Sequence, residues 1–89
     1  MKAASFTQTG PPEVIKWVDL PTPEPKPHEI LVRVKAVSVN PIDTYIRAGV
    51  IPTALPMPYI VGCDFAGTVE AVGGSVGNCR VGQQVYNVY

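Results

Sequence analysis

The segment NPIDTYIRAG, residues 40–49, brings together the side chains with the greatest capacity for chemistry in this chain. Asn40 carries an amide, Asp43 a carboxylate and Tyr45 a phenol. A phenol offers both a flat apolar ring and a hydroxyl group that can donate a hydrogen bond. The plainer explanations are that Asp43 caps a local turn, that Asn40 caps a helix and that Tyr45 only packs.

The same segment predicts the element that must position these groups. Asn40 is a competent helix cap, Pro41 suits the first helical position, and Gly49 is a natural stop. We therefore expect a short helix of one or two turns between residues 41 and 48.

The glycines of residues 67–77 invite a test for nucleotide binding. Their positions never give the spacing G-x-G-x-x-G, and no helical pattern follows them. Without a helix N-terminus aimed at a pyrophosphate, the dinucleotide fingerprint is absent from this chain.

The sequence does not indicate a metal site either. His28 is the only histidine and lies in a proline-rich connection, far along the chain from Cys63 and Cys79. Zinc needs several Cys or His ligands at recurring spacing, so we expect no bound metal. Two cysteines are also too few for a disulfide framework, and we expect both to be reduced thiols.

Short β-strands dominate the rest of the chain, because apolar residues alternate over short runs between prolines and glycines. The expected strands cover residues 2–6, 13–20, 29–40, 65–72 and 81–89. Residues 21–29 read as an extended, polyproline-like connection and residues 50–59 as a loop. Together, these expected elements predict a mainly β barrel or sandwich-like domain with one short helix.

Composition narrows the class of protein. The 89 residues support one small domain, and the formal net charge of zero argues against nucleic acid as a partner. No apolar run approaches the roughly 20 residues of a membrane helix, and the N-terminus lacks the apolar core of a secretory signal. We therefore expect a cytoplasmic protein without a membrane partner.

Several phrases, in order along nearly the whole chain, carry a family resemblance. They are MKAASFTQTGPPEVI, NPIDTYIRAG, LPMPYIVGCDFAGTVEAVG and VGQQVY. Together they resemble the medium-chain dehydrogenase/reductase superfamily, and within it the quinone oxidoreductase, or zeta-crystallin-like, branch. The second phrase is fairly specific to that branch, whereas the third is shared more widely.

The resemblance implies a GroES-like, partly open β-barrel with one short helix, incomplete at its C-terminus. Residues 1–89 would form part of the catalytic domain, and the Rossmann domain that holds NADPH would be absent from this chain. The implied activity is NADPH-dependent reduction of a quinone or enone, by a full-length enzyme expected to be a homodimer. The 89-residue chain alone is expected to be inactive.

The resemblance also suggests roles for individual residues. Zinc-dependent alcohol dehydrogenases of the superfamily carry a Cys where this chain has Asn40 and a His where it has Cys63, which implies a metal-free relative. Asn40 and Tyr45 would face the nicotinamide of NADPH, and Asp43 would orient them or support the substrate cleft. Because a quinone is already electrophilic, the protein mainly has to bring the two reactants into register.

Two alternatives remain open at this point. The absent cofactor fingerprint would equally suit a non-catalytic GroES-like binding or assembly module. An enoyl-thioester or other alkene reductase of the same superfamily is the second alternative. Val50 and Ile51 weaken it, because some of those reductases carry an aromatic or acidic residue after the short helix.

Overall fold

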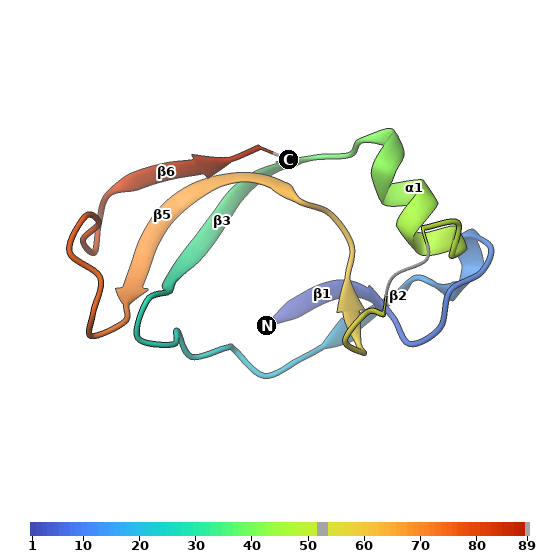
Figure 1. Cartoon of the computed structure of the whole chain (residues 1–89), viewed down its shortest axis with the longest axis horizontal. Helices are drawn as coiled ribbons and strands as arrows, with labels where there is room; N and C mark the ends of the chain where they lie inside the picture. Colours follow the sequence, from blue (N-terminus) through green and yellow to red (C-terminus); the bar gives the residue numbers. More distant parts are fainter. Residues whose placement is uncertain (52–53, 89) are drawn as a thin grey trace. The chain divides into compact units, whose positions relative to one another are not determined.

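A computed structural model describes residues 1–51 and 54–88 of the chain. The described residues form six strands, one 3-10 turn and one α-helix (Figure 1). In chain order they are β1 (Lys2–Phe6), η1 (Pro12–Val14), β2 (Lys16–Asp19), β3 (Ile30–Ser38), α1 (Pro41–Ala48), β4 (Tyr59–Ile60), β5 (Asp64–Val72) and β6 (Gln84–Asn87). The chain divides into two compact units, Met1–Pro21 with Val39–Gly62, and Thr22–Ser38 with Cys63–Tyr89.

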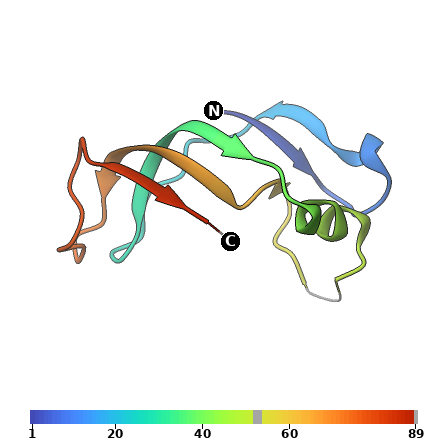
Figure 2. The ribbon, with the colours of Figure 1, turned by 90° about the horizontal axis from the view of Figure 1, so that it is seen from above.

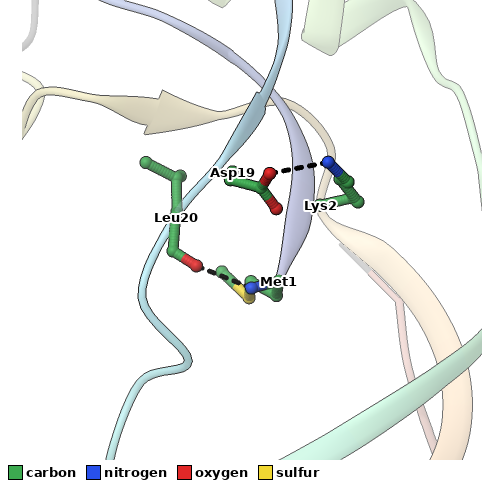
Figure 3. Close-up of polar contacts among 4 residues, drawn as sticks. All are labelled: Met1, Lys2, Asp19 and Leu20. Carbon is green, nitrogen blue, oxygen red and sulfur yellow. Dashed lines mark hydrogen bonds and ion pairs between the residues drawn. The ribbon is translucent and has the colours of Figure 1, made fainter.

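The first unit contains a three-stranded antiparallel sheet in the order β2-β1-β4. Two polar contacts close the open end of its β1–β2 hairpin (Figure 3). The Met1 amino group donates to the Leu20 carbonyl at 2.7 Å, and Lys2 Nζ lies 2.6 Å from Asp19 Oδ2. The Lys2 and Asp19 side chains are mostly exposed, so their ion pair is worth about 0–1 kcal/mol.

The buried residues of this sheet come from its central strand. Ala3, Ser5 and Phe6 are buried, and only 1% of Phe6 is exposed. The Phe6 ring lies 5.3 Å from the Tyr59 ring, centroid to centroid, and the two residues are register partners in the β1–β4 pair. Tilted aromatic pairs of this kind stabilise a structure beyond their buried area. This contact adds to the backbone pairing that holds the two-residue strand β4 against β1.

The second unit contains the sheet β3-β5-β6, again antiparallel, with β5 in the middle. Figures 1 and 2 both show these three strands side by side. Val69 of β5 is its buried apolar residue, with 1% exposed. The β3–β5 register shifts twice, between Leu31 and Val32 and between Val34 and Ala36. The strict alternation of faces expected over residues 29–40 is therefore interrupted at both places.

A tight turn over residues 26–29 ties the start of β3 to the end of β5. The Gly73 N–H donates to the Glu29 carbonyl at 2.8 Å, and the Ser75 N–H donates to the Pro27 carbonyl at 2.8 Å. An added Cβ at Gly73 would lie only 2.0 Å from the Lys26 carbonyl oxygen. Glycine at position 73 is what allows the two backbones to approach this closely.

The mainly β class with one short helix is confirmed, and several element boundaries differ from expectation. The strand expected over residues 29–40 covers only Ile30–Ser38, and the strand expected over residues 65–72 starts at Asp64. The strand expected over residues 13–20 starts only at Lys16, because η1 takes up Pro12–Val14. The loop expected over residues 50–59 ends in the first residue of β4, and residues 52–53 lie outside the described part. The last expected strand, residues 81–89, is shorter at Gln84–Asn87, and residue 89 is also outside the description.

Candidate functional site

Asp43 and Tyr45 lie in helix α1, and Asn40 directly precedes it. The helix begins and ends where the sequence predicts. Asn40 is its N-cap with extended backbone, and Pro41 occupies the first turn. Gly49 ends the helix in the left-handed conformation, with φ of 82°, and its N–H donates to the Ile46 carbonyl at 3.2 Å. A residue with a Cβ rarely adopts this conformation, which explains the stop.

The N-terminal end of α1 is built by a capping box between Asn40 and Asp43. The Asp43 Oδ2 atom accepts the Asn40 N–H at 2.9 Å, and the Asp43 N–H donates to the Asn40 carbonyl at 3.0 Å. A carboxylate in the first turn also interacts favourably with the positive end of the helix dipole. Asp43 therefore fixes the backbone of Asn40, which lies just before the helix.

Asp43 is the buried residue of α1, with only 4% of its surface exposed. Its second carboxylate oxygen, Oδ1, is buried and has no hydrogen-bond partner among the described residues. A buried acceptor without a donor costs about 1–3 kcal/mol, so such an atom calls for a donor from elsewhere.

Tyr45 lies on the opposite, open face of the same helix and is 52% exposed. The other exposed residues of α1 are Pro41, Thr44 and Ala48. In a helix, residues 41, 44, 45 and 48 share one face, and those flanking Tyr45 have short side chains. The face therefore presents one phenol ring with no large helical neighbour beside it.

The three predicted residues are close in sequence but do not form a single cluster. Asp43 and Tyr45 are two positions apart, which places their side chains about 200° apart around the helix. Asp43 thus supports Asn40 from the buried side, whereas Tyr45 faces outward. Asn40 is half-buried at the helix start. A contact of Tyr45 and Asn40 with a cofactor remains a prediction.

Sequence reasoning missed the role of Arg47. Among the described residues, Arg47 forms no ion pair with a carboxylate. Arg47 Nη1 instead donates to the Gly10 carbonyl at 2.7 Å, and the Gly10 N–H donates to the Arg47 carbonyl at 2.9 Å. No local pattern in the sequence indicates this contact, because Gly10 and Arg47 are 37 positions apart.

The residues considered for metal binding do not meet. His28 is exposed in the connection before β3, and among residues 1–51 and 54–88 no group of three or more His, Cys, Asp or Glu side chains could hold a metal ion. Cys63 and Cys79 are both half-buried, and they form no disulfide in the described part of the chain. In the part of the chain that is described, no helix has the length and apolar character needed to cross a membrane.

Comparison with known proteins identifies the family of this chain. Residues 26–89 match the model of the alcohol dehydrogenase GroES-like domain. The chain belongs to this family. The GroES-like fold and the likeness to quinone oxidoreductases expected from the motifs are both confirmed.

The individual relatives that resemble this chain include quinone oxidoreductases. The chain is 41% identical over 87 residues to a quinone oxidoreductase of Lama guanicoe, covering 97% of this chain and 26% of that protein. It is 36% identical, with a TM-score of 0.89, to the structure of Escherichia coli quinone oxidoreductase complexed with NADPH, covering 97% of this chain and 26% of the other. The chain thus spans about a quarter of the length of the curated relatives it matches.

One similar structure comes from a different class of enzyme. It is a thermostable alcohol dehydrogenase from Pyrobaculum aerophilum with bound cobalt and zinc, 44% identical with a TM-score of 0.88, and the match covers 97% of this chain and 26% of that one. Fold likeness therefore does not separate a reductase without metal from a metal-dependent dehydrogenase. The two classes of enzyme have to be distinguished by the types of the residues at the site.

Proposed function

We propose that this chain is the N-terminal catalytic-domain portion of an NADPH-dependent quinone oxidoreductase. Residues 1–89 would supply the GroES-like side of the cofactor cleft, and a Rossmann domain outside this chain would hold the rest of the cofactor. The observation that carries the proposal is the open face of α1 with its half-exposed phenol. The similarity to quinone oxidoreductases over 97% of the chain supports it.

The residues fit a nicotinamide contact in a specific way. The Tyr45 ring offers a flat apolar surface, and its hydroxyl offers a hydrogen bond to the carboxamide of the cofactor. Asn40 would present its amide at the N-terminal end of the same helix, on a backbone held by Asp43. When bound, NADPH supplies a hydride to the quinone. The protein residues would bind, orient and shield the reactants, which is the main contribution needed for an electrophilic acceptor.

Asn40 and Cys63 also favour a reductase that works without zinc. An amide at position 40 is a poor zinc ligand compared with the thiolate implied by the family pattern, and Cys63 belongs to no group of three or more His, Cys, Asp or Glu among the described residues that could hold a metal ion. Absence of zinc remains part of the proposal. We further propose that the complete enzyme is a cytoplasmic homodimer and that it accepts quinones in preference to other enones.

The experiment uses the complete natural polypeptide that contains residues 1–89. Purified protein is mixed with NADPH and, in separate reactions, a soluble benzoquinone, an aliphatic enone and an enoyl thioester, and nicotinamide absorbance is followed. The reverse reaction, a primary alcohol with NADP⁺, tests for dehydrogenase activity, and metal analysis of the same sample tests for zinc. Fastest NADPH consumption with the quinone, in protein without stoichiometric zinc, is the expected result.

Other outcomes lead to other functions. Faster turnover of the enoyl thioester would favour the alkene reductase alternative. Alcohol oxidation with one zinc ion per chain would favour a metal-dependent dehydrogenase. No nicotinamide chemistry and no cofactor binding would favour a non-catalytic module and reject the proposal.

A further inference from the structure

We infer that Arg47 is a positioning residue for the cofactor contact. It holds α1 against the segment Thr9–Gly10 and thereby sets where Tyr45 lies. This inference rests on the proposed function, since it assumes that Tyr45 contacts the nicotinamide. It goes further by assigning to Arg47, and to its partner Gly10, a role in the affinity for NADPH that neither residue type would suggest.

The contact between Arg47 and Gly10 is reciprocal. The guanidinium donates to the Gly10 carbonyl at 2.7 Å, and the Arg47 carbonyl accepts the Gly10 N–H at 2.9 Å. The two residues are 37 positions apart, so this pair joins the last turn of α1 to the loop between β1 and β2. Figure 2 shows α1 beside that loop. A hydrogen bond from a charged donor is roughly twice as strong as a neutral one.

A second contact fixes the same end of the helix. Gly49 lies so close to Thr9 that an added Cβ would be 2.8 Å from the Thr9 Oγ1 atom. The last turn of α1 thus meets the Thr9–Gly10 segment both at Arg47 and at Gly49. Two separate contacts resist rotation of the helix about its own axis, which a single contact would allow.

The segment that receives these contacts is itself stiff. Gly10 is followed by Pro11 and Pro12, whose rings restrict the backbone. The Val14 N–H donates to the Pro11 carbonyl at 3.0 Å, and the Ile15 N–H donates to the Pro12 carbonyl at 3.2 Å, forming the turn η1. Arg47 is therefore anchored to a supported loop rather than to a free one.

Tyr45 would respond to a loss of this anchor because it belongs to the same helical turn. It precedes Arg47 by two residues, so it projects from the side of α1 opposite the anchor. Rotation or sliding of the helix would move the outward ring relative to a bound nicotinamide. A misplacement of about 1 Å is enough to reduce rates on the order of a hundredfold in a positioned reaction. Arg47 would thus act through Tyr45 without touching the cofactor.

A double-mutant cycle on NADPH binding tests this coupling. The dissociation constant is measured by the fluorescence of NADPH for the complete natural polypeptide containing residues 1–89, as wild type, Arg47→Ala, Tyr45→Ala and the double variant. We expect Arg47→Ala to weaken binding by about tenfold, because Tyr45 is no longer held in position, and by less than about twofold when Tyr45 is already Ala. Arg33→Ala, which removes an exposed arginine paired with Glu70, is the matched control and should leave the dissociation constant unchanged.

Equal effects of Arg47→Ala in both backgrounds would overturn the inference, because Arg47 would then act independently of Tyr45. If Arg47→Ala does not fold, the cycle is run with Arg47→Lys. Lysine keeps the charge and one donor but loses the planar fork, so we expect a loss of about threefold that again depends on Tyr45. Full wild-type affinity in Arg47→Lys together with additive effects would equally overturn it.

Amide hydrogen exchange gives a readout that does not need the cofactor. The Gly10 N–H should exchange at least about tenfold faster in Arg47→Ala than in wild type, because its acceptor is no longer held in place. Unchanged exchange at Gly10 would contradict the anchor itself. If wild-type protein does not bind NADPH at all, the proposed function fails; if it binds and the cycle is additive, only the role of Arg47 fails.

Discussion

Replacement of Gly67 by alanine tests the β3–β5 pairing at its tightest point. Gly67 lies in the middle of β5, where it pairs with Val34 on one side and Val85 on the other. An added Cβ would be 2.2 Å from the Arg33 carbonyl oxygen and 2.9 Å from the Arg33 carbonyl carbon. Both atoms belong to the backbone, so relief requires that the two strands separate at this position.

The size of the effect follows from that geometry. Overpacking of side chains costs about 1–3 kcal/mol, and a clash with backbone belongs at the upper end or beyond. We expect Gly67→Ala to lower the free energy of unfolding by about 3 kcal/mol or more, a large share of the roughly 5–10 kcal/mol available to a small domain. With a urea slope of about 1 kcal/mol per molar, the midpoint would fall by about 3 M.

The assay is urea unfolding followed by far-UV circular dichroism, with Gly74→Ala as the matched control. That change adds the same methyl group in the turn that follows β5, where nothing lies within 4 Å of the added Cβ. We expect Gly74→Ala to stay within about 1 kcal/mol of wild type. Equal stability of the Gly67 and Gly74 variants would refute the close approach of β3 to β5.

Two further predictions concern the ends of α1. Gly49→Ala should lower the free energy of unfolding by about 1–2 kcal/mol, because φ of 82° disfavours alanine and the new Cβ would contact Thr9. Adding Thr9→Ala to the same chain should recover only the part of this stability that is lost through the contact with Thr9. Complete recovery would show that backbone strain contributes nothing. Asp43→Ala should cost about 1–2 kcal/mol by removing the bond to the Asn40 N–H, and Asp43→Asn should cost less because its amide oxygen can keep that bond. Urea unfolding checks both, and an Asp43→Ala variant as stable as wild type would contradict the capping role.

The parts of the fold set by local sequence were predictable. Asn40, Pro41 and Gly49 define the helix through their own backbone preferences, and the structure places α1 between them. The strand β1 was likewise predicted at residues 2–6. These elements need no knowledge of distant residues.

Long-range contacts set the parts that were missed. β4 forms where Tyr59 pairs with Phe6 across more than fifty residues, and a segment rich in prolines gives no local sign of a strand. The shifts in β3 register depend on how β5 lies against it. Short-range alternation cannot indicate a bulge, because the extra residue is defined only by the partner strand.

In the candidate site, too, some features could be predicted from the sequence and others could not. The cap formed by Asn40 could be foreseen from residue types, since Asn and Asp are common at helix starts. The opposite directions of Asp43 and Tyr45 follow from helical geometry once the helix bounds are known. The anchoring of Arg47 could not be foreseen, because it depends on Gly10 lying beside the last turn of α1.

The central claim is that α1 presents Tyr45 to the nicotinamide of NADPH in a quinone reductase. The most direct measurement is steady-state NADPH-dependent quinone reduction by the complete natural polypeptide, compared with Tyr45→Ala, Tyr45→Phe and the exposed control Trp17→Ala. We expect kcat/KM for NADPH to fall about tenfold or more in Tyr45→Ala, to fall less in Tyr45→Phe, and to be unchanged in Trp17→Ala. Equal values of kcat/KM for wild type and Tyr45→Ala would contradict the central claim.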